Sequence, residues 1–304
     1  MTIFLPVAGV SINLFLLLGT GALVGFLSGL VGVGGGFLLT PVLMMMGVPA
    51  TVAAASGTNA LVGTSASATA AHFRLGNVDL KLGSLLLMGG LFGAAIGVQI
   101  IKVLRQVGSA DLAITITYVF VLGFVGTFMF IESLHSLRQR VVIANPRVAA
   151  ERPTFLKRLP LQMNFPRSKV QHSVIVPFLL CTLVGILAAI MGVGGGFIMV
   201  PMMVYLLRMP MHVAVGTDLF QILFTCAGVT IMQATTNFTV DITLALLVAV
   251  GSTVGAQLGA RLSRMLRGEQ LRIVLASVVL IVTAKMAIGL VLAPLSLLAQ
   301  LEGH

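Results

Sequence analysis

Charged residues are scarce in this chain of 304 residues. Asp, Glu, Lys and Arg make up 9% of the sequence, hydrophobic residues make up 58%, and the mean hydropathy is +1.11. A soluble domain carries about 25% charged residues, so this chain lacks the side chains needed to cover a surface in water. Several apolar runs reach about 20 residues, the length that spans a bilayer as helix. No strand-like alternation accompanies them, and the composition therefore predicts an all-α polytopic membrane protein.

Cysteine and catalytic residue combinations are also rare. The two cysteines, Cys181 and Cys226, each lie inside an apolar run, where a small buried hydrophobic role is expected; neither a disulfide framework nor a metal site is indicated. The sequence shows no nucleophile beside a base and no paired carboxylates. We therefore expect no enzyme, no metal and no cofactor. The N-terminus lacks a basic region and a cleavage site, so the first apolar run is expected to be a retained helix.

Glycine, in contrast, is abundant and patterned. The stretch Gly32–Phe37, followed by Pro41, recurs with identical residues as Gly192–Phe197, followed by Pro201. Three adjacent glycines disfavour a regular helix, because glycine loses the most backbone entropy on ordering. Each half is therefore expected to contain a helix that is broken or re-entrant at this stretch.

Other features recur at nearly the same separation, which indicates an internal duplication. Glycines at four-residue spacing recur in both halves, and Asp79 has a counterpart in Asp241. The predicted organisation is a first transmembrane repeat at 1–131, a basic linker at 132–172 and a second repeat at 173–304, with about 8–10 membrane segments. Small-residue spacing lets helices approach closely in lipid, and it is compatible with a homo-oligomer as well as with a single chain.

The basic residues are clustered. Eight of the 18 Lys and Arg residues lie between Arg138 and Lys169, and four lie between Arg261 and Arg272. Clustered basic loops indicate the cytoplasmic side of a membrane, so the net charge of +10 is interpreted as topology and no nucleic-acid partner is expected. The rule places the linker, the Arg74–Lys81 loop and the Arg261 loop inside, and the Lys102–Asp111 loop outside.

Equivalent loops of the two halves then lie on opposite sides of the membrane. The repeats are therefore predicted to be inverted, an arrangement common in secondary transporters, whose substrate site lies between the repeats near the midplane. A parallel duplication is the alternative.

Helices that restart at Phe37 and Phe197 would present free N–H groups and the positive end of a helix dipole, which favour anions. The glycines Gly34, Gly35, Gly36, Gly194, Gly195 and Gly196 are therefore candidate anion-binding residues. A tight helix crossing that requires glycine is the competing interpretation.

Polar residues follow each break. Thr58, Asn59, Thr217 and Asp218 are candidate substrate-binding residues, with interhelical hydrogen bonding as the alternative. A straight alignment pairs Ser56 with Thr217, whereas local similarity pairs Gly57–Asn59 with Gly216–Asp218, and the sequence leaves both open.

Three ionisable residues are candidates for coupling or charge compensation. Asp218 lies within a helical region, where an acidic group is by default a functional hypothesis, often a proton relay; the alternative is a helix-start residue. Lys285 could neutralise an anion or pair with Asp218, or simply snorkel. His72 lies beside Arg74 at a helix end, where an interfacial role is the alternative.

The repeated Gly-Val-Gly-Gly-Gly-Phe element with its following proline resembles the signature of the TauE/SafE family of sulfite exporters. Met209–Thr217 is similar to the second motif of that family, and His72–Asp79 to the loop that follows it. The resemblance implies a secondary transporter for sulfite, sulfoacetate or a related small sulfur-containing anion, located in the bacterial inner membrane and commonly an exporter. The competing readings are an uptake permease for an organosulfonate or another anion, and a membrane scaffold that transports nothing.

Overall fold

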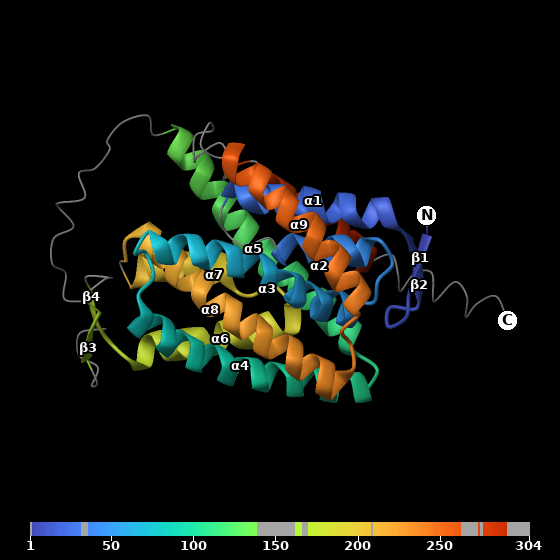
Figure 1. Ribbon diagram of the computed structural model, residues 1–304, viewed down its shortest axis with the longest axis horizontal. Helices are drawn as coiled ribbons and strands as arrows, with labels where there is room; N and C mark the ends of the chain where they lie inside the picture. Colours follow the sequence, from blue (N-terminus) through green and yellow to red (C-terminus); the bar gives the residue numbers. More distant parts are fainter. Residues whose placement is uncertain are drawn as a thin grey trace.

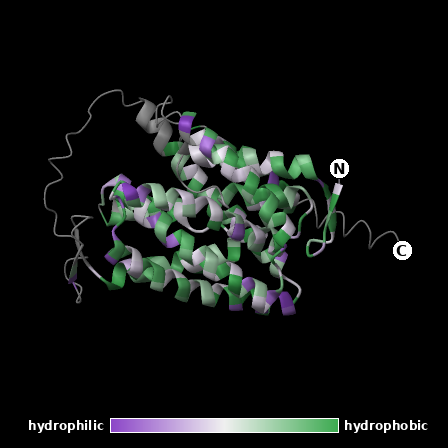
Figure 2. Cartoon of the chain, viewed as in Figure 1, coloured by the Kyte–Doolittle hydropathy of each residue, from purple (hydrophilic) through white to green (hydrophobic). Residues whose placement is uncertain are grey.

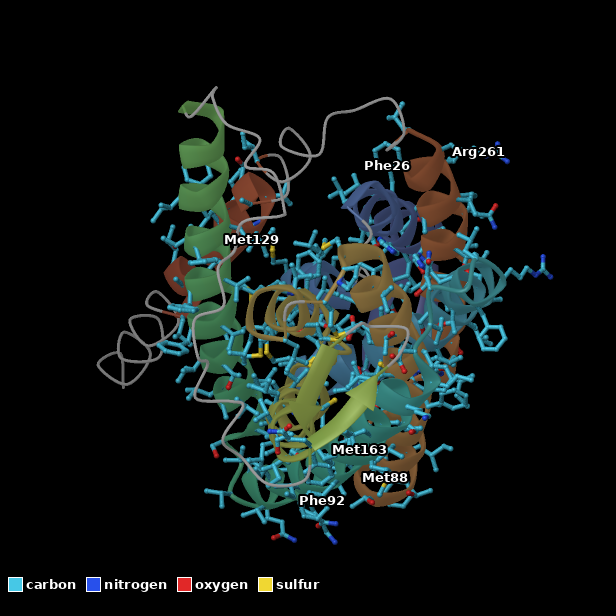
Figure 3. All side chains as sticks on the ribbon, turned by 90° about the vertical axis from the view of Figure 1, so that its left-hand side faces the viewer. Phe26, Met88, Phe92, Met129, Met163 and Arg261 are labelled. Atoms are coloured by element: carbon cyan, nitrogen blue, oxygen red, sulfur yellow. The ribbon has the colours of Figure 1, made fainter. Side chains whose placement is uncertain are left out.

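The computed structural model describes residues 2–31, 36–138, 162–165, 170–207, 209–262, 273 and 276–290. It is a bundle of long helices that lie side by side, with their ends gathered at two opposite faces (Figure 1). Hydrophobic residues dominate the helix flanks, and strongly hydrophilic residues concentrate near the helix ends (Figure 2). Side chains such as Met88 and Phe92, 65% and 57% exposed, point away from the bundle (Figure 3). Such apolar flanks suit contact with lipid.

The first half begins with a β-hairpin of β1 (Thr2–Leu5) and β2 (Val10–Asn13) and continues with α1 (Leu14–Val31), α2 (Gly36–Met45), α3 (Ala50–Arg74), α4 (Leu80–Gln106) and α5 (Ala110–Arg138). The second half begins with a hairpin of β3 (Gln162–Phe165) and β4 (Val170–Ser173), then α6 (Ile175–Met191), α7 (Gly196–Pro201) with a π-helical turn (Met202–Leu206), α8 (Met211–Met232) with a second such turn (Gln233–Asn237), α9 (Ile242–Leu262) and a last helix (Ala276–Leu290).

Four helical stretches are long and apolar enough to cross a membrane: Leu80–Gln106, Ala110–Ile131, Met211–Asn237 and Ile242–Gly259. The shorter helices α1, α2, α6 and the last one are also apolar. These elements confirm the prediction of an all-α polytopic membrane protein. Helix α5 continues to Arg138, within the region predicted as a linker, and the β3–β4 hairpin covers the end of that region and Ser173.

The closest helix packing occurs between the two halves, where α1 lies along α9 and α4 along α6. Glycine makes both contacts possible. A Cβ atom on Gly25 would lie 2.1 Å from the carbonyl oxygen of Ser252, and one on Gly185 would lie 2.3 Å from the carbonyl oxygen of Gly90. Because only glycine permits such an approach, the four-residue glycine spacing marks the interfaces between the halves.

The two halves exchange equivalent contacts. Gly25 and Gly185 occupy equivalent places in the duplicated sequence, and so do their partners Ser252 and Gly90. In Figure 1, α1 and α3 run from right to left, whereas α6 and α8 run from left to right. This is the pattern that inverted repeats would give, although the orientation of the halves across a membrane stays a prediction.

Candidate functional site

The second helix break is described completely. Helix α6 ends at Met191, and its C-cap Gly192 has a left-handed conformation with φ 74°. Gly194 and Gly195 follow with φ 74° and 83°, and α7 begins at Gly196. Residues other than glycine are strained in this region, so the backbone itself requires glycine here. In the first break, Gly34 and Gly35 lie outside the described residues, and Gly36 begins α2.

The glycines of the second break have different roles. A Cβ atom on Gly192 would lie 2.1 Å from the backbone oxygen of Ala54 in α3, so this glycine allows α6 to end against α3. One on Gly195 would lie 2.2 Å from the Val184 side chain. The tight-crossing interpretation therefore holds for Gly192, while Gly194 and Gly195 also shape the turn through their positive φ.

The first residues of α2 and α7 meet at the centre of the molecule. The ring centroids of Phe37 and Phe197 are 5.6 Å apart. Leu61 of α3 lies between the two breaks, since Cβ atoms on Gly36 and Gly194 would lie 2.3 and 3.1 Å from its side chain. The two helix starts are thus in contact through aromatic and aliphatic side chains.

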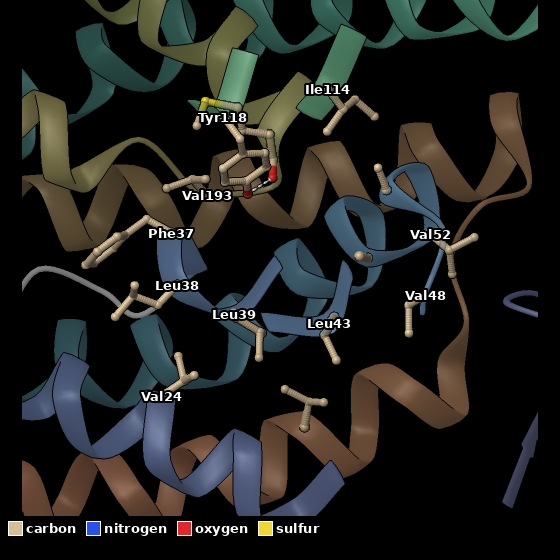
Figure 4. Packing of buried hydrophobic residues seen from close by; sticks show 14 of the residues in the cluster. Val24, Phe37, Leu38, Leu39, Leu43, Val48, Val52, Ile114, Tyr118 and Val193 are labelled. Carbon is tan, nitrogen blue, oxygen red and sulfur yellow. Dashed lines mark hydrogen bonds between the residues drawn. The ribbon is translucent and has the colours of Figure 1, made fainter. Parts of the chain in front are cut away.

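Tyr118 of α5 fixes the end of α6 in this region. Its side chain is fully buried, and its hydroxyl donates a hydrogen bond to the carbonyl of Met191, next to Val193 and Phe37 in Figure 4. A hydroxyl on a terminal carbonyl satisfies one of the acceptors that a helix end leaves open. Tyr118 therefore stabilises the broken end on which the second glycine stretch depends.

Thr217 has a structural contact that the sequence did not reveal. Its hydroxyl accepts a hydrogen bond of 3.1 Å from the backbone N–H of Asp79, the N-cap of α4. Ser56 accepts one of 3.1 Å from the N–H of Asp241, which precedes α9. These matching contacts favour the straight alignment of Ser56 with Thr217. On that alignment Asp218 corresponds to Gly57.

Thr58 and Asn59 differ in whether their side-chain donors are free to bind an anion. The Thr58 hydroxyl is fully buried and donates to the Ala55 carbonyl at 2.6 Å, so its proton is used within α3. The side chain of Asn59 is half-buried and makes no hydrogen bond to the described residues. Of these two predicted residues, Asn59 is the freer donor for an anion.

Asp218 lies deep in α8, 2% exposed, and it forms no ion pair within the described part of the chain. Lys285 does not compensate it, because the lysine side chain is exposed on the last helix. A helix-start position for Asp218 is wrong, since α8 begins at Met211. Gln221, which is 1% exposed and one helical turn further on, is not among the predicted site residues; its spacing from Asp218 was the available signal.

His72 lies in the polar connection at the end of α3, outside the apolar spans. Its Nδ1 atom is buried without a hydrogen-bond partner among the described residues, and it lies near Gly216 of α8. Burial and the nearby His212 lower the pKa of this imidazole below its ordinary value of 6.5. His72 is therefore mostly neutral at neutral pH, which argues against charge compensation.

A small cavity lies beside the start of α2. Its lining includes Gly36, Ala60, Leu61, Thr64 and Ser252, from α2, α3 and α9. The cavity places Gly36, the first residue of α2, next to hydroxyl-bearing side chains.

These features define a helical membrane protein in which the starts of α2 and α7 lie together. Residues 17–286 match the model of the family described as "Sulfite exporter TauE/SafE", and the chain belongs to this family. It is similar to the probable membrane transporter protein YunE of Bacillus subtilis, with 28% identity over 66% of this chain and 70% of that protein. It is also similar to the probable membrane transporter protein YjnA of the same organism (25%, over 86% and 94%) and to a probable membrane transporter protein of Xylella fastidiosa strain 9a5c (29%, over 69% and 70%). No solved structure matches the chain significantly. The protein is accordingly a membrane transporter.

Proposed function

We propose that this transporter moves sulfite, or a closely related small sulfur oxyanion, out of the cell across the bacterial inner membrane. The observation that carries the proposal is the meeting of the two helix starts at Phe37 and Phe197. Helix N-termini attract anions through their free N–H groups and dipoles, and broken helices at a repeat interface are a common substrate site in secondary transporters.

The proposed anion site lies between the two breaks. Gly34–Gly36 and Gly194–Gly196 supply backbone N–H groups, and Asn59 supplies a side-chain amide. Thr58 lies on α3 and Thr217 on α8, and the hydroxyls of both already take part in hydrogen bonds. Neutral donors of this kind bind an oxyanion without a fixed positive charge, which favours release.

We propose alternating access, in which the two halves of the protein move against each other. In the present structure Phe37 packs against Phe197, and Leu61 lies beside Gly36 and Gly194. A rocking motion of one half would open this centre to one side at a time. Asp218 is the residue that we propose to couple the cycle to protons, with the basic linker and the Arg261 end of α9 on the cytoplasmic side.

Counterflow with labelled sulfite tests the proposal. Proteoliposomes loaded with unlabelled sulfite should take up labelled sulfite faster than protein-free liposomes, and excess sulfoacetate should compete more strongly than chloride. Exchange no faster than in protein-free liposomes would contradict a sulfite transporter.

A glycine pair supplies the matched variants for this assay. Gly195→Leu, at φ 83° and beside Val184, should abolish counterflow while the protein remains in the membrane; Gly47→Leu, at φ 90° with no atom within 4 Å, should retain it. Normal counterflow by Gly195→Leu would rule out a role for this helix break in transport.

A further inference from the structure

Two of the buried side-chain oxygens on α8 that have no partner among the described residues lie one helical turn apart. Asp218 and Gln221 lie three residues apart, a spacing that places side chains on one helix face, and they are 2% and 1% exposed. Asp218 Oδ1 and Gln221 Oε1 are both buried and have no hydrogen-bond partner in the described part of the protein. Buried polar atoms are nearly always hydrogen bonded, so this pair points to a ligand that supplies a positive or donor group.

Thr225, one turn further along α8, fixes the amide of Gln221. Its Nε2 atom donates a hydrogen bond of 2.9 Å to Thr225 Oγ1. Both groups converge on Gly90 of α4, whose absent Cβ would lie 2.7 Å from Nε2, 2.9 Å from Oγ1 and 3.4 Å from Cys181 Sγ. With the nitrogen held by Thr225, the opposite end of the amide, Oε1, remains available.

The first half of the protein has no such pair. On the alignment set by the Ser56 and Thr217 contacts, Asp218 and Gln221 correspond to Gly57 and Ala60. Ala60 instead lines the small cavity beside α2. Because the helix packs at both places, the fold does not require a carboxyl group there, and the pair is a feature of the second half alone.

Few other titratable groups face this pair. Cys181 of α6 and Cys226 of α8 interact electrostatically with Asp218. His72 at the end of α3 and Asp79 before α4 lie beside the neighbouring residues Gly216 and Thr217, α7 has no ionisable side chain, and no Lys or Arg in the described part of the chain forms an ion pair with Asp218. An ionised Asp218 would therefore be a buried charge without a counter-ion, which is costly.

We propose that Asp218 and Gln221 together bind a single proton. The proton adds to a carboxylate oxygen of Asp218, and the resulting O–H donates a hydrogen bond to Gln221 Oε1. Binding thereby neutralises the buried charge and satisfies both acceptors, and the proton returns to water when the site opens. The proposed coupling of this proton to transport rests on the proposed function. The proton site itself does not, because it can be tested in the protein without substrate.

Infrared spectroscopy of the purified protein tests the site without any substrate. At neutral pH the wild-type protein should show a carboxylic-acid C=O stretching band that Asp218→Asn removes and Asp111→Asn leaves unchanged. Asp111 is a matched control because its carboxylate is solvent-accessible and already accepts the Thr51 N–H at 2.8 Å. Gln221→Met, which keeps the volume but lacks the acceptor, should shift the band because the hydrogen bond is lost. Absence of the band, or its survival in Asp218→Asn, would overturn the proton site.

A transport assay then tests whether the proton site is coupled to substrate movement. A difference of one pH unit should drive about tenfold accumulation of sulfite if one proton accompanies each transport event. Asp218→Asn, in which a neutral amide replaces the protonated acid and can still donate to Gln221, should retain counterflow and lose this accumulation. Gln221→Met should flatten the pH profile of transport.

The possible outcomes are distinct. An Asp218-dependent band without sulfite flux supports the proton site and contradicts the proposed substrate. Sulfite flux in a protein that lacks the band supports the substrate and contradicts the proton site. If a pH difference still drives sulfite accumulation in Asp218→Asn, the coupling role of Asp218 is contradicted.

Discussion

The N–H of Asp79, at the start of α4, donates a hydrogen bond of 3.1 Å to the hydroxyl of Thr217 in α8. The equivalent bond joins Asp241 to Ser56 at the same distance, with the roles of the halves exchanged. Each half therefore fixes the start of a helix in the other. A polar residue that the sequence suggested for substrate binding is also part of the interface between the repeats.

Thr217 should consequently be needed for stability. We expect Thr217→Val to lower the free energy of unfolding by about 1–3 kcal/mol, because the N–H of Asp79 loses its hydroxyl acceptor. Thr217→Ser keeps the acceptor and should unfold close to wild type. Thermal unfolding in detergent measures both; an unchanged Thr217→Val protein would mean that this contact contributes nothing to the folded state.

Gly192 should tolerate substitution less well than a glycine of similar conformation. Gly108→Ala, at φ 76° with no atom within 4 Å, should cost only the left-handed backbone strain of about 1–2 kcal/mol. Gly192→Ala, at φ 74°, must in addition displace the backbone of α3 at Ala54. The comparison is made by the fraction of protein that stays folded on heating, and equal losses for the two variants would contradict the packing role.

The two phenylalanines at the helix starts should be energetically coupled. Aromatic pairs at this separation contribute about 0.5–1.5 kcal/mol beyond the area that they bury. A double-mutant cycle with Phe37→Leu and Phe197→Leu, read as unfolding free energies, should give a coupling of that size. Strictly additive effects would show that the two helix starts do not stabilise each other.

Asn59 should affect substrate affinity more than Thr58 does. A hydrogen bond to a charged ligand contributes about 1.5–3 kcal/mol, so Asn59→Leu should raise the KM for sulfite by about tenfold or more. Thr58→Ala should change KM little, because its hydroxyl already donates to Ala55. Ser67→Ala, an exposed residue on the same helix whose hydroxyl bonds to Thr64, serves as the control. An Asn59→Leu transporter with wild-type KM would remove Asn59 from the site.

The orientation of the halves can be measured by labelling. In a background without Cys181 and Cys226, both buried, single cysteines at positions 74 and 261 should react with an impermeant maleimide from the cytoplasmic side. A cysteine at position 102 should react from the opposite side. Labelling of positions 74 and 102 from one side would contradict the predicted topology.

Local sequence was sufficient to predict most elements. The predicted restart of a helix at Phe37 agrees with α2, which begins at Gly36, and the predicted long apolar helices agree with the four described stretches that could cross a membrane, because apolar length and glycine runs act locally. The ends of the helices were harder to predict from the sequence. Helix α5 continues seven residues past the apolar run that ends at Ile131, to Arg138, since a polar stretch can extend a helix beyond the membrane.

The sequence by itself determined that this is a helical membrane protein, duplicated, with a glycine break in each half. It did so because hydropathy and repeated spacing are one-dimensional properties. Only the tertiary structure decided which polar residues have partners: it assigned the hydroxyls of Thr217 and Ser56 to the interface and left Asp218 Oδ1 and Gln221 Oε1 without a donor among the described residues. Hydrogen-bond satisfaction depends on side chains from distant helices, and no pattern within a single helix contains that information.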